Sequence, residues 1–365
     1  MMTRLLEILI SIAIVAVLFL VVGAILPSQR SITESVETNR RLPIVFDTLN
    51  SLRRFDDWNP LVLRDPKAQL KLVGPAEGVG ARLEFVSANE AIGTGSWEIV
   101  ESERNKRVAI DIEDASRGTG KRTEFKLKPT GQRGRNVAIT QTYEIDYGWD
   151  IIGRYQGLYL NSNVGDDMKL GLQRLGNMLA TIPNQDYSML GQRPGTSAPR
   201  IDQRAAENLL VVGAAVDRAK VQDQIKGNME WIRKVMAANG LSAAGPMRIV
   251  TNELGQEMYS FEVVQPVRRG GATTEASAAA AADAGGKLDI ALQGPVEARF
   301  TEPARVVTAS FRGHMNQLGS VRDTLRAWAL TRGYETAERP YEAWKSGIDP
   351  SFTPEGEFDV YWVVR

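Results

Sequence analysis

The strongest constraint on this chain is an uninterrupted apolar segment close to its N-terminus. Residues 8–26 are nineteen consecutive positions without a charged side chain, and Pro27 follows them. A helix of that length spans about 28 Å, close to the hydrocarbon thickness of a bilayer, and a proline ends a helix. The segment therefore predicts a retained single-pass membrane anchor within residues 1–29.

A cleaved signal peptide shares some of these features, because Arg4 precedes the apolar run and residues 22–24 form an acceptable cleavage site. The run is, however, longer than the ~7–15 apolar residues typical of such peptides. A buried core helix is seldom so uniformly apolar. The flanking charges, Arg4 on one side and Arg30, Arg40 and Arg41 on the other, do not decide the orientation. We expect a cell-membrane protein and leave the side of its soluble domains open.

Composition excludes several classes of site. The chain has 365 residues, 44 basic and 44 acidic side chains, no cysteine and one histidine, His314. Without cysteine there is no disulfide framework, thiolate metal site or cysteine nucleophile, and one imidazole makes a histidine-rich metal site untenable. A chain with zero net charge lacks the excess of basic side chains that is expected of a dedicated nucleic-acid binder. We therefore expect no metal, no cofactor and no nucleic-acid partner, whereas the oligomeric state is not indicated.

Two biased segments divide the chain, whose length suits two domains. Residues 186–208 are rich in Gly, Pro, Ser, Gln and Arg and predict an interdomain linker. Residues 270–286 contain mostly Ala, Gly, Thr and Ser, which predicts a disordered insertion. The expected domains therefore cover residues 30–185 and 209–365.

The first domain combines strands with a long helix. Apolar and polar residues alternate over 107–113 and 137–146, which predicts strands with one buried face. Shorter candidate strands lie at 69–73, 81–86, 93–101 and 123–128, and their short Gly-rich turns favour antiparallel pairing. One helical stripe then follows, made of Met168, Leu172, Leu175, Leu179 and Ile182. This helix must cover the sheet, and a curved sheet leaves a ligand-sized cavity beneath it.

The second domain contains an internal repeat. Its first half predicts a strand at 209–216, a helix at 221–236 and strands at 247–251 and 258–264. Its second half repeats this order with a strand at 306–311, a helix at 315–328 and strands at 341–345 and 358–364. Gly240 and Gly333 follow the two helices, where a left-handed residue is needed. We predict a pseudo-two-fold β-α-β-β duplication with both helices on one face and a ligand groove along the pseudo-axis.

The first domain resembles a known superfamily. The residues that carry the resemblance are Pro27-Ser28, a strand at 31–37, Pro43 before a short helix, Phe55-Asp56-Asp57-Trp58-Asn59-Pro60, Gly78-Val79-Gly80, Gly93-Thr94-Gly95-Ser96-Trp97-Glu98-Ile99, and the closing segment 165–175. This pattern resembles the START/polyketide-cyclase-like (SRPBCC) superfamily over about 30–185. The resemblance implies a START-like helix-grip fold, in which a curved antiparallel sheet surrounds a long C-terminal helix and an apolar cavity. It implies no particular ligand.

The second domain is similar to another family. The matching residues are Gly313-His314-Met315, Leu325-Arg326-Ala327-Trp328, Arg332-Gly333-Tyr334, Pro340-Tyr341-Glu342-Ala343-Trp344, Asp349-Pro350 and Asp359-Val360-Tyr361-Trp362-Val363-Val364. They resemble the gyrase-inhibitor-like (GyrI-like) effector-binding domain. The resemblance implies binding of amphipathic, often cationic molecules through aromatic walls and a buried carboxylate. Regulators of this kind carry a helix-turn-helix, which is not evident here, and some GyrI-like members are hydrolases.

Candidate ligand-binding residues in the first domain are Trp97, Gln141 and Tyr143. Gln141 interrupts an apolar strand face between Ile139 and Tyr143, so it is placed to orient a ligand inside the cavity. A bulge or a wet strand end explains Gln141 equally well. Trp97 and Tyr143 either line the same space or belong to the core.

Candidates in the second domain are aromatic and acidic. Trp328, Tyr341, Trp344, Tyr361 and Trp362 crowd its second half and predict an aromatic cage for an apolar or cationic ligand, with core packing as the alternative. Glu262 lies between Phe261 and Val263, and is the best candidate for a groove carboxylate that pairs with a cation or acts as a base. Glu342 and Glu357 flank the second hairpin. A solvent-facing strand position is the alternative for all three.

The sequence thus favours an α+β, membrane-anchored protein that binds small hydrophobic or amphipathic molecules for sensing, sequestration or transfer. Burial of apolar ligand surface, at ~25 cal/mol per Å², would drive binding. An enzyme of cyclase-like or hydrolase type that uses a groove carboxylate such as Glu262 is one alternative, and we assign no catalytic residue. A protein-interaction module without a ligand is the other alternative.

Overall fold

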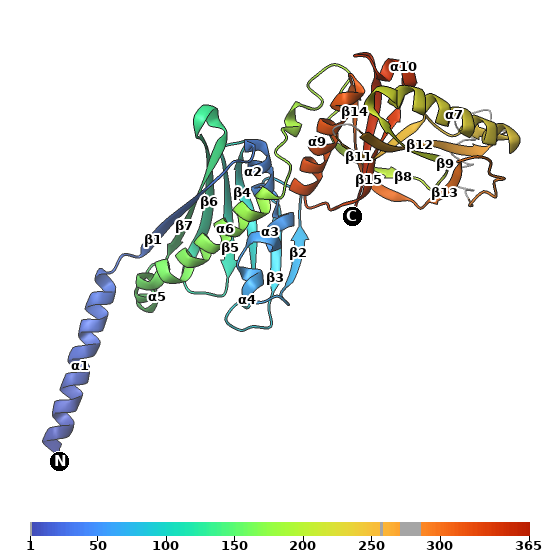
Figure 1. Cartoon of the computed structure of the whole chain (residues 1–365). Coiled ribbons are helices and arrows are strands. Elements are labelled where there is room, and N and C mark those ends of the chain that lie inside the picture. The colour runs from blue at the N-terminus through green and yellow to red at the C-terminus, as the bar shows by residue number, and fades with distance from the viewer. Residues whose placement is uncertain (1, 256–257, 271–285) are drawn as a thin grey trace. The chain divides into compact units, whose positions relative to one another are not determined.

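The computed structural model describes residues 2–255, 258–270 and 286–365. The chain forms two compact units that divide between Ile182 and Pro183 (Figure 1), and we call them the N-terminal and C-terminal units. Both are α+β, and in both the sheets are antiparallel, as expected from the alternating patterns and short turns.

The N-terminal apolar segment is a single helix, α1 (Met2–Ile25). It is long and apolar enough to cross a membrane by length and composition, a property that signal sequences share. From Leu6 onward nearly all of its side chains are exposed. An exposed surface of this kind is unfavourable in water and favourable in lipid.

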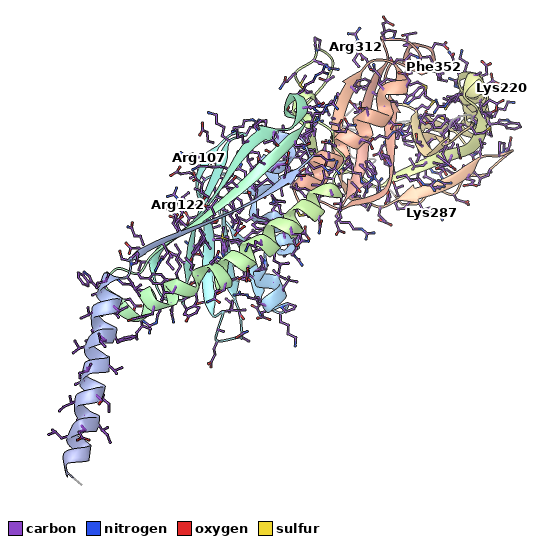
Figure 2. All side chains as sticks on the ribbon, turned by 60° about the vertical axis from the view of Figure 1, so that its left-hand side comes forward. Arg107, Arg122, Lys220, Lys287, Arg312 and Phe352 are labelled. Atoms are coloured by element: carbon purple, nitrogen blue, oxygen red, sulfur yellow. The ribbon has the colours of Figure 1, made fainter. Side chains whose placement is uncertain are left out.

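A curved seven-stranded antiparallel sheet forms the body of the N-terminal unit, in the order β1-β7-β6-β5-β4-β3-β2 (Figure 1). Its strands are β1 (Gln29–Thr38), β2 (Gln69–Val73), β3 (Arg82–Val86), β4 (Thr94–Glu103), β5 (Arg107–Asp114), β6 (Thr119–Thr130) and β7 (Asn136–Asp146). One face is buried, and the other carries Arg107 and Arg122, which Figure 2 labels. Both form ion pairs across this face, Arg107 with acidic residues of β4 and β6, and Arg122 with acidic residues of β4 and β5. This division into a buried and a polar face is what the alternating sequence predicts.

Helices cover the buried face of this sheet. They are α2 (Leu42–Leu49), α3 (Phe55–Trp58), α4 (Leu61–Arg64), α5 (Ile151–Gln156) and α6 (Asp166–Ala180). Four residues of the predicted stripe, Met168, Leu172, Leu175 and Leu179, are buried on α6. The fifth, Ile182, is also buried but follows the end of the helix at Ala180. The helix lies along the sheet and contacts β1 and α3, which is the helix-grip arrangement (Figure 1).

The C-terminal unit is built on a duplicated sheet, in the order β13-β9-β12-β11-β15-β16-β14-β8, with β10 (Leu241–Ala243) paired to β12. The main strands are β8 (Arg200–Arg204), β9 (Glu207–Asp217), β11 (Arg248–Leu254), β12 (Met258–Arg269), β13 (Glu297–Thr301), β14 (Ala304–Arg312), β15 (Thr336–Trp344) and β16 (Glu357–Val364). The triplet β9-β12-β11 is matched by β14-β16-β15, and the halves meet where β11 pairs β15. The strand order thus has the predicted pseudo-two-fold symmetry.

Both long helices of this unit pack on one face of its sheet. They are α7 (Val221–Ala238) and α9 (Leu318–Thr331), and a short helix, α10 (Ile348–Ser351), lies between β15 and β16. One continuous core joins the two helices to the strands. Gly240 and Gly333, the residues after the helices, have φ values of 62° and 77°. These are the left-handed conformations that helix ends favour and that glycine adopts without strain.

The segment predicted as a linker contains regular structure. Within 186–208, Arg200–Arg204 forms the edge strand β8, which pairs with β14, and β9 begins at Glu207. Ile201 is the single apolar residue of β8, so the strand is held by backbone hydrogen bonds and lacks the alternation that identifies strands in sequence. The insertion predicted over 270–286 lies outside the described residues except for its two end glycines.

Candidate functional site

The N-terminal unit encloses a cavity of about 320 Å³ between its sheet and α6. Its floor comes from strands β3 to β7, and its sides come from α3, α4 and α6. The strands curve away from the helix, so the side chains between them do not fill the space. A volume of this size lies at the lower end of the range for small-molecule sites.

The walls of this cavity are mainly apolar and aromatic. The apolar lining consists of Trp58, Pro60, Leu61, Phe85, Ile92, Trp97, Ile112, Val164 and Met168. Phe55 makes edge contacts with the rings of Trp58 and Trp97, at centroid distances of 5.8 and 5.0 Å. These contacts restrict both tryptophans, so the apolar wall is largely pre-formed.

Neutral polar side chains also line this space, among them Gln141 and Tyr143. Gln141 is buried and donates a hydrogen bond of 3.0 Å to the Thr123 hydroxyl. Tyr143 is also buried, and burial raises the pKa of its phenol well above the ordinary value, so the hydroxyl keeps its proton. Both groups can therefore offer hydrogen bonds to a ligand without carrying charge.

The candidates Trp97, Gln141 and Tyr143 come together in the structure, since all three line this one cavity. Their role in ligand binding stays a prediction. Sequence reasoning gave no role to Trp58, Arg64 or Asp167, which line the same cavity. The sequence Asp56-Asp57-Trp58-Asn59-Pro60 marked the position of Trp58, but nothing local indicated that it faces a cavity.

Charged residues at this cavity are paired with one another. Asp114 accepts hydrogen bonds from Lys121, at 2.5 Å, and from Ser116. Burial alone would raise the pKa of Asp114, but these bonds lower it overall, so the carboxylate stays ionised. Arg64 pairs with Asp167, whose pKa is raised by burial against the opposing effect of Arg64. A ligand therefore meets charges that are already compensated.

The C-terminal unit carries a smaller groove, of about 230 Å³, on the sheet face opposite α7 and α9. Glu262 lines it, and its two carboxylate oxygens accept hydrogen bonds of 2.6 and 3.0 Å from Arg299. Arg248 also lines the groove and forms two 2.6 Å hydrogen bonds with Glu207. Glu262 is therefore paired with a side chain of the protein itself, and its role in ligand binding stays a prediction.

The structure does not bring the predicted aromatic cage together. Tyr341 stacks on Tyr361 with centroids 5.0 Å apart on the groove face, and burial raises the pKa of Tyr361 to about 12. Trp344 lies three positions from Tyr341, so it points to the opposite face and is buried against Phe352 and Phe358.

The remaining two tryptophans are also separate. Trp328 projects from α9, where it stacks on Tyr334 and lies under the Arg332 guanidinium. Trp362 lies beneath Arg326. The prediction of one cage was therefore wrong, because side chains that are close in sequence alternate between the faces of a strand.

A different carboxylate is the buried one in this unit. Glu342 is fully buried on the helix side of β15, and one of its oxygens accepts a 2.5 Å hydrogen bond from Arg322 of α9. Its other oxygen, Oε2, has no hydrogen-bond partner within the part of the chain that the structure describes. Burial raises the pKa of Glu342, while Arg322 acts in the opposite direction.

Three solved structures resemble parts of the chain. The EcmrR C-terminal domain is 16% identical, with a TM-score of 0.35, and the match covers 46% of this chain and 96% of that one. Norcoclaurine synthase from Thalictrum flavum is 13% identical, with a TM-score of 0.33 and coverage of 44% and 91%. An EcmrR–DNA complex is 16% identical, with a TM-score of 0.37 and coverage of 59% and 72%. Likeness at this level carries no functional argument, so the absence of a nucleic-acid partner stays a prediction.

A comparison with curated proteins found no match. The comparison with protein families did find one, and it covers most of the N-terminal unit, from the first strand of the sheet to the end of α6. By sequence, residues 29–179 match the family described as "Polyketide cyclase / dehydrase and lipid transport", which points to ligand binding by this unit.

Proposed function

We propose that this chain is a membrane-anchored binding protein for small hydrophobic or amphipathic molecules, which it senses, sequesters or transfers. The observation that carries the proposal is the cavity of the N-terminal unit. Gln141, whose amide nitrogen donates to Thr123, and Tyr143 are buried side chains that line this cavity. Both are neutral polar groups that can form hydrogen bonds with a ligand held against the apolar wall.

The ligand that suits this cavity is uncharged and mostly apolar, with one hydroxyl or carbonyl group. Apolar surface buried against the tryptophans supplies the affinity, at ~25 cal/mol per Å². An ionised ligand group would lose its hydration, and the Gln141 and Tyr143 side chains at the cavity floor carry no charge to compensate for it. The Asp114 and Asp167 carboxylates are already paired with Lys121 and Arg64.

The apolar helix α1 supports the membrane part of the proposal. Molecules of this class concentrate in lipid, so an anchored cavity stays where its ligand is most abundant. A second ligand in the groove of the C-terminal unit, as the GyrI-like resemblance implies, remains a prediction, since the Glu262 and Arg248 side chains that line it are bonded within the protein.

Native mass spectrometry of the full chain released from lipid nanodiscs tests the proposal. The expected result is a bound small molecule whose occupancy falls at least about tenfold in Val164→Trp, which places a large ring in the cavity. Val79→Trp is the matched control, because Val79 is exposed and lies outside the cavity lining. It should bind as the unaltered chain does.

The class of ligand is tested in the same experiment with three added probes of equal chain length. The uncharged alkylphenol 4-octylphenol should bind more tightly than octanoate or octylamine. A chain that is always empty and binds none of the probes contradicts the proposal and favours a protein-interaction module. Stronger binding of octanoate or octylamine contradicts the uncharged class. Turnover of a bound molecule would favour the enzyme alternative.

A further inference from the structure

The end of α1 is not a free tether, because it packs against α5. The Phe19 and Tyr155 rings stack with centroids 4.5 Å apart and an interplanar angle of 8°. The Tyr155 hydroxyl also donates a 2.8 Å hydrogen bond to the Phe19 carbonyl. At Gly23 a Cβ atom would lie 2.3 Å from the Ile151 side chain, so glycine is what allows this close approach.

A buried arginine completes the junction between α1 and α5. Arg154 of α5 donates hydrogen bonds to the carbonyls of Gly23, Ala24 and Leu26, at 3.4, 2.8 and 3.2 Å. The last carbonyls of a helix have no partner within the helix, and here one guanidinium satisfies them. A charged guanidinium is costly in hydrocarbon, so Arg154 marks the level at which the apolar part of a bilayer must end.

Large apolar side chains surround this junction without cover from the protein. Trp149 is 85% exposed, Tyr159 66%, Leu158 52% and Ile152 51%. The Arg154 guanidinium carbon lies 5.3 Å from the centre of the Trp149 ring. Trp and Tyr side chains concentrate at the boundary between lipid tails and headgroups, where one end of the ring is apolar and the other is wet.

We infer that Trp149, Ile152, Leu158 and Tyr159 form a lipid-contacting surface, which we call the interfacial surface. It binds the headgroup region of the same membrane that α1 enters, and so rests on the anchor of the proposed function. Continuity argues for lipid as the partner: Arg154 joins the C-terminal end of α1 directly to the segment that carries these side chains.

The same contacts argue that α1 is retained. Cleavage after Ala24 would remove Phe19 and Gly23, and would expose the Tyr155 ring and Ile151 that now pack against them. It would also take away two of the three α1-end carbonyls that Arg154 binds. A temporary targeting segment has no need of such a junction, whereas a permanent anchor is oriented by it.

The natural absence of cysteine makes a direct test simple. A nitroxide is attached to Ile152→Cys or Tyr159→Cys in the full chain, reconstituted in nanodiscs of phosphatidylcholine with phosphatidylglycerol. Accessibility to oxygen, which enriches in lipid, is compared with accessibility to a polar nickel chelate. Val79→Cys is the matched control, since Val79 is 60% exposed in the same unit and far in sequence from α5.

The oxygen-to-nickel ratio should be severalfold higher at positions 152 and 159 than at position 79. A ratio equal to that at position 79 overturns the inference. Shielding of positions 152 and 159 from both reagents also overturns it, because that result indicates a protein partner or a second copy. The measurement uses no ligand, so an empty cavity with lipid-exposed labels contradicts the proposed ligand binding and leaves the interfacial surface intact.

Discussion

The cavity of the N-terminal unit and the groove of the C-terminal unit differ in what their polar groups bind. In the cavity, Gln141 and Tyr143 are neutral side chains that line the space where a ligand would lie. In the groove, Glu262 binds Arg299 and Arg248 binds Glu207, through two hydrogen bonds in each pair. Both sites have apolar surface beside these groups.

This difference teaches how to rank candidate sites on one chain. Paired charges satisfy each other, and a ligand that displaces one partner must compensate for the lost bonds. Neutral polar groups in an apolar cavity gain hydrogen bonds when a ligand arrives. We therefore rank the N-terminal cavity as the better candidate site, although the C-terminal unit holds more of the candidate residues named from the sequence.

The largest expected effect tests the pairing within the C-terminal unit. Glu342→Leu leaves Arg322 buried without its carboxylate, which should lower the free energy of unfolding by about 3–5 kcal/mol. The double variant Glu342→Leu/Arg322→Leu removes both charges and should lie close to the unaltered chain. Hydrogen exchange of the sheet amides of this unit measures both values. A loss below about 1 kcal/mol in the single variant would show that the pair is unimportant.

The next prediction compares the removal of a tyrosine hydroxyl in the two units. Tyr143→Phe and Gln141→Leu should each weaken 4-octylphenol binding about tenfold, which corresponds to about 1.4 kcal/mol for a lost hydrogen bond. Tyr361→Phe removes the same hydroxyl from the C-terminal unit and should leave binding unchanged. Native mass spectrometry with increasing probe concentration gives the three affinities. Equal losses from Tyr143→Phe and Tyr361→Phe would place ligand in both units.

A change in pH should alter the folding stability of the two units in opposite directions. The pKa of Asp114 is lowered on folding, so it contributes stability above its ordinary value of 3.8, and this contribution is lost as the pH falls through the folded pKa. The pKa of Glu342 is raised, so the folded state holds its proton more tightly, and stability falls as the pH rises above 4.5 towards the folded pKa.

Urea unfolding of the full chain at several pH values measures these slopes. In the unfolding transition of the N-terminal unit, Asp114→Asn should reduce the loss of stability that occurs at low pH. In the unfolding transition of the C-terminal unit, Glu342→Gln should reduce the loss of stability that occurs as the pH rises. Slopes of the same sign in both units would contradict the assigned directions.

The smallest effect concerns the exposed ion pairs. Arg299→Ala at the groove and Arg64→Ala at the cavity should each change the free energy of unfolding by at most about 1 kcal/mol, because solvent screens such pairs. The two arginines differ in their position, because Arg64 lines the cavity and Arg299 lines the groove. A loss of 4-octylphenol binding in Arg299→Ala alone would reverse our ranking of the two sites.

Much of the fold could be predicted from periodicity. The strands around Ile110 and Ile139 and the stripe of α6 have clear patterns, because each buries one face against a large partner. The strand β8 could not be recognised, because an edge strand with one apolar residue is held by its backbone. Gln141 was recognisable for a related reason, since a polar residue on an apolar strand face must have a partner or a cavity.

The site was harder to predict than the fold. The Arg64–Asp167 pair joins residues about a hundred positions apart, and no local pattern encodes such a pair. No sequence pattern indicates the role of Arg154, because its partners are backbone carbonyls at the end of a helix about 130 positions away. The prediction of an aromatic cage was wrong for a simpler reason. Tyr341 and Trp344 are three residues apart on one strand, and an odd spacing places them on opposite faces of the sheet.

The short connection between α1 and β1 has a mechanical consequence. Residues 26–28 are all that separate the helix from the strand, and β1 is an edge strand that pairs with β7 from Gln29 to Thr38. A force that pulls α1 along the direction of β1 would load all of these hydrogen bonds at once, in shear, instead of opening them one after another. A strand loaded in this way should resist a pull on α1 better than one whose bonds open in turn.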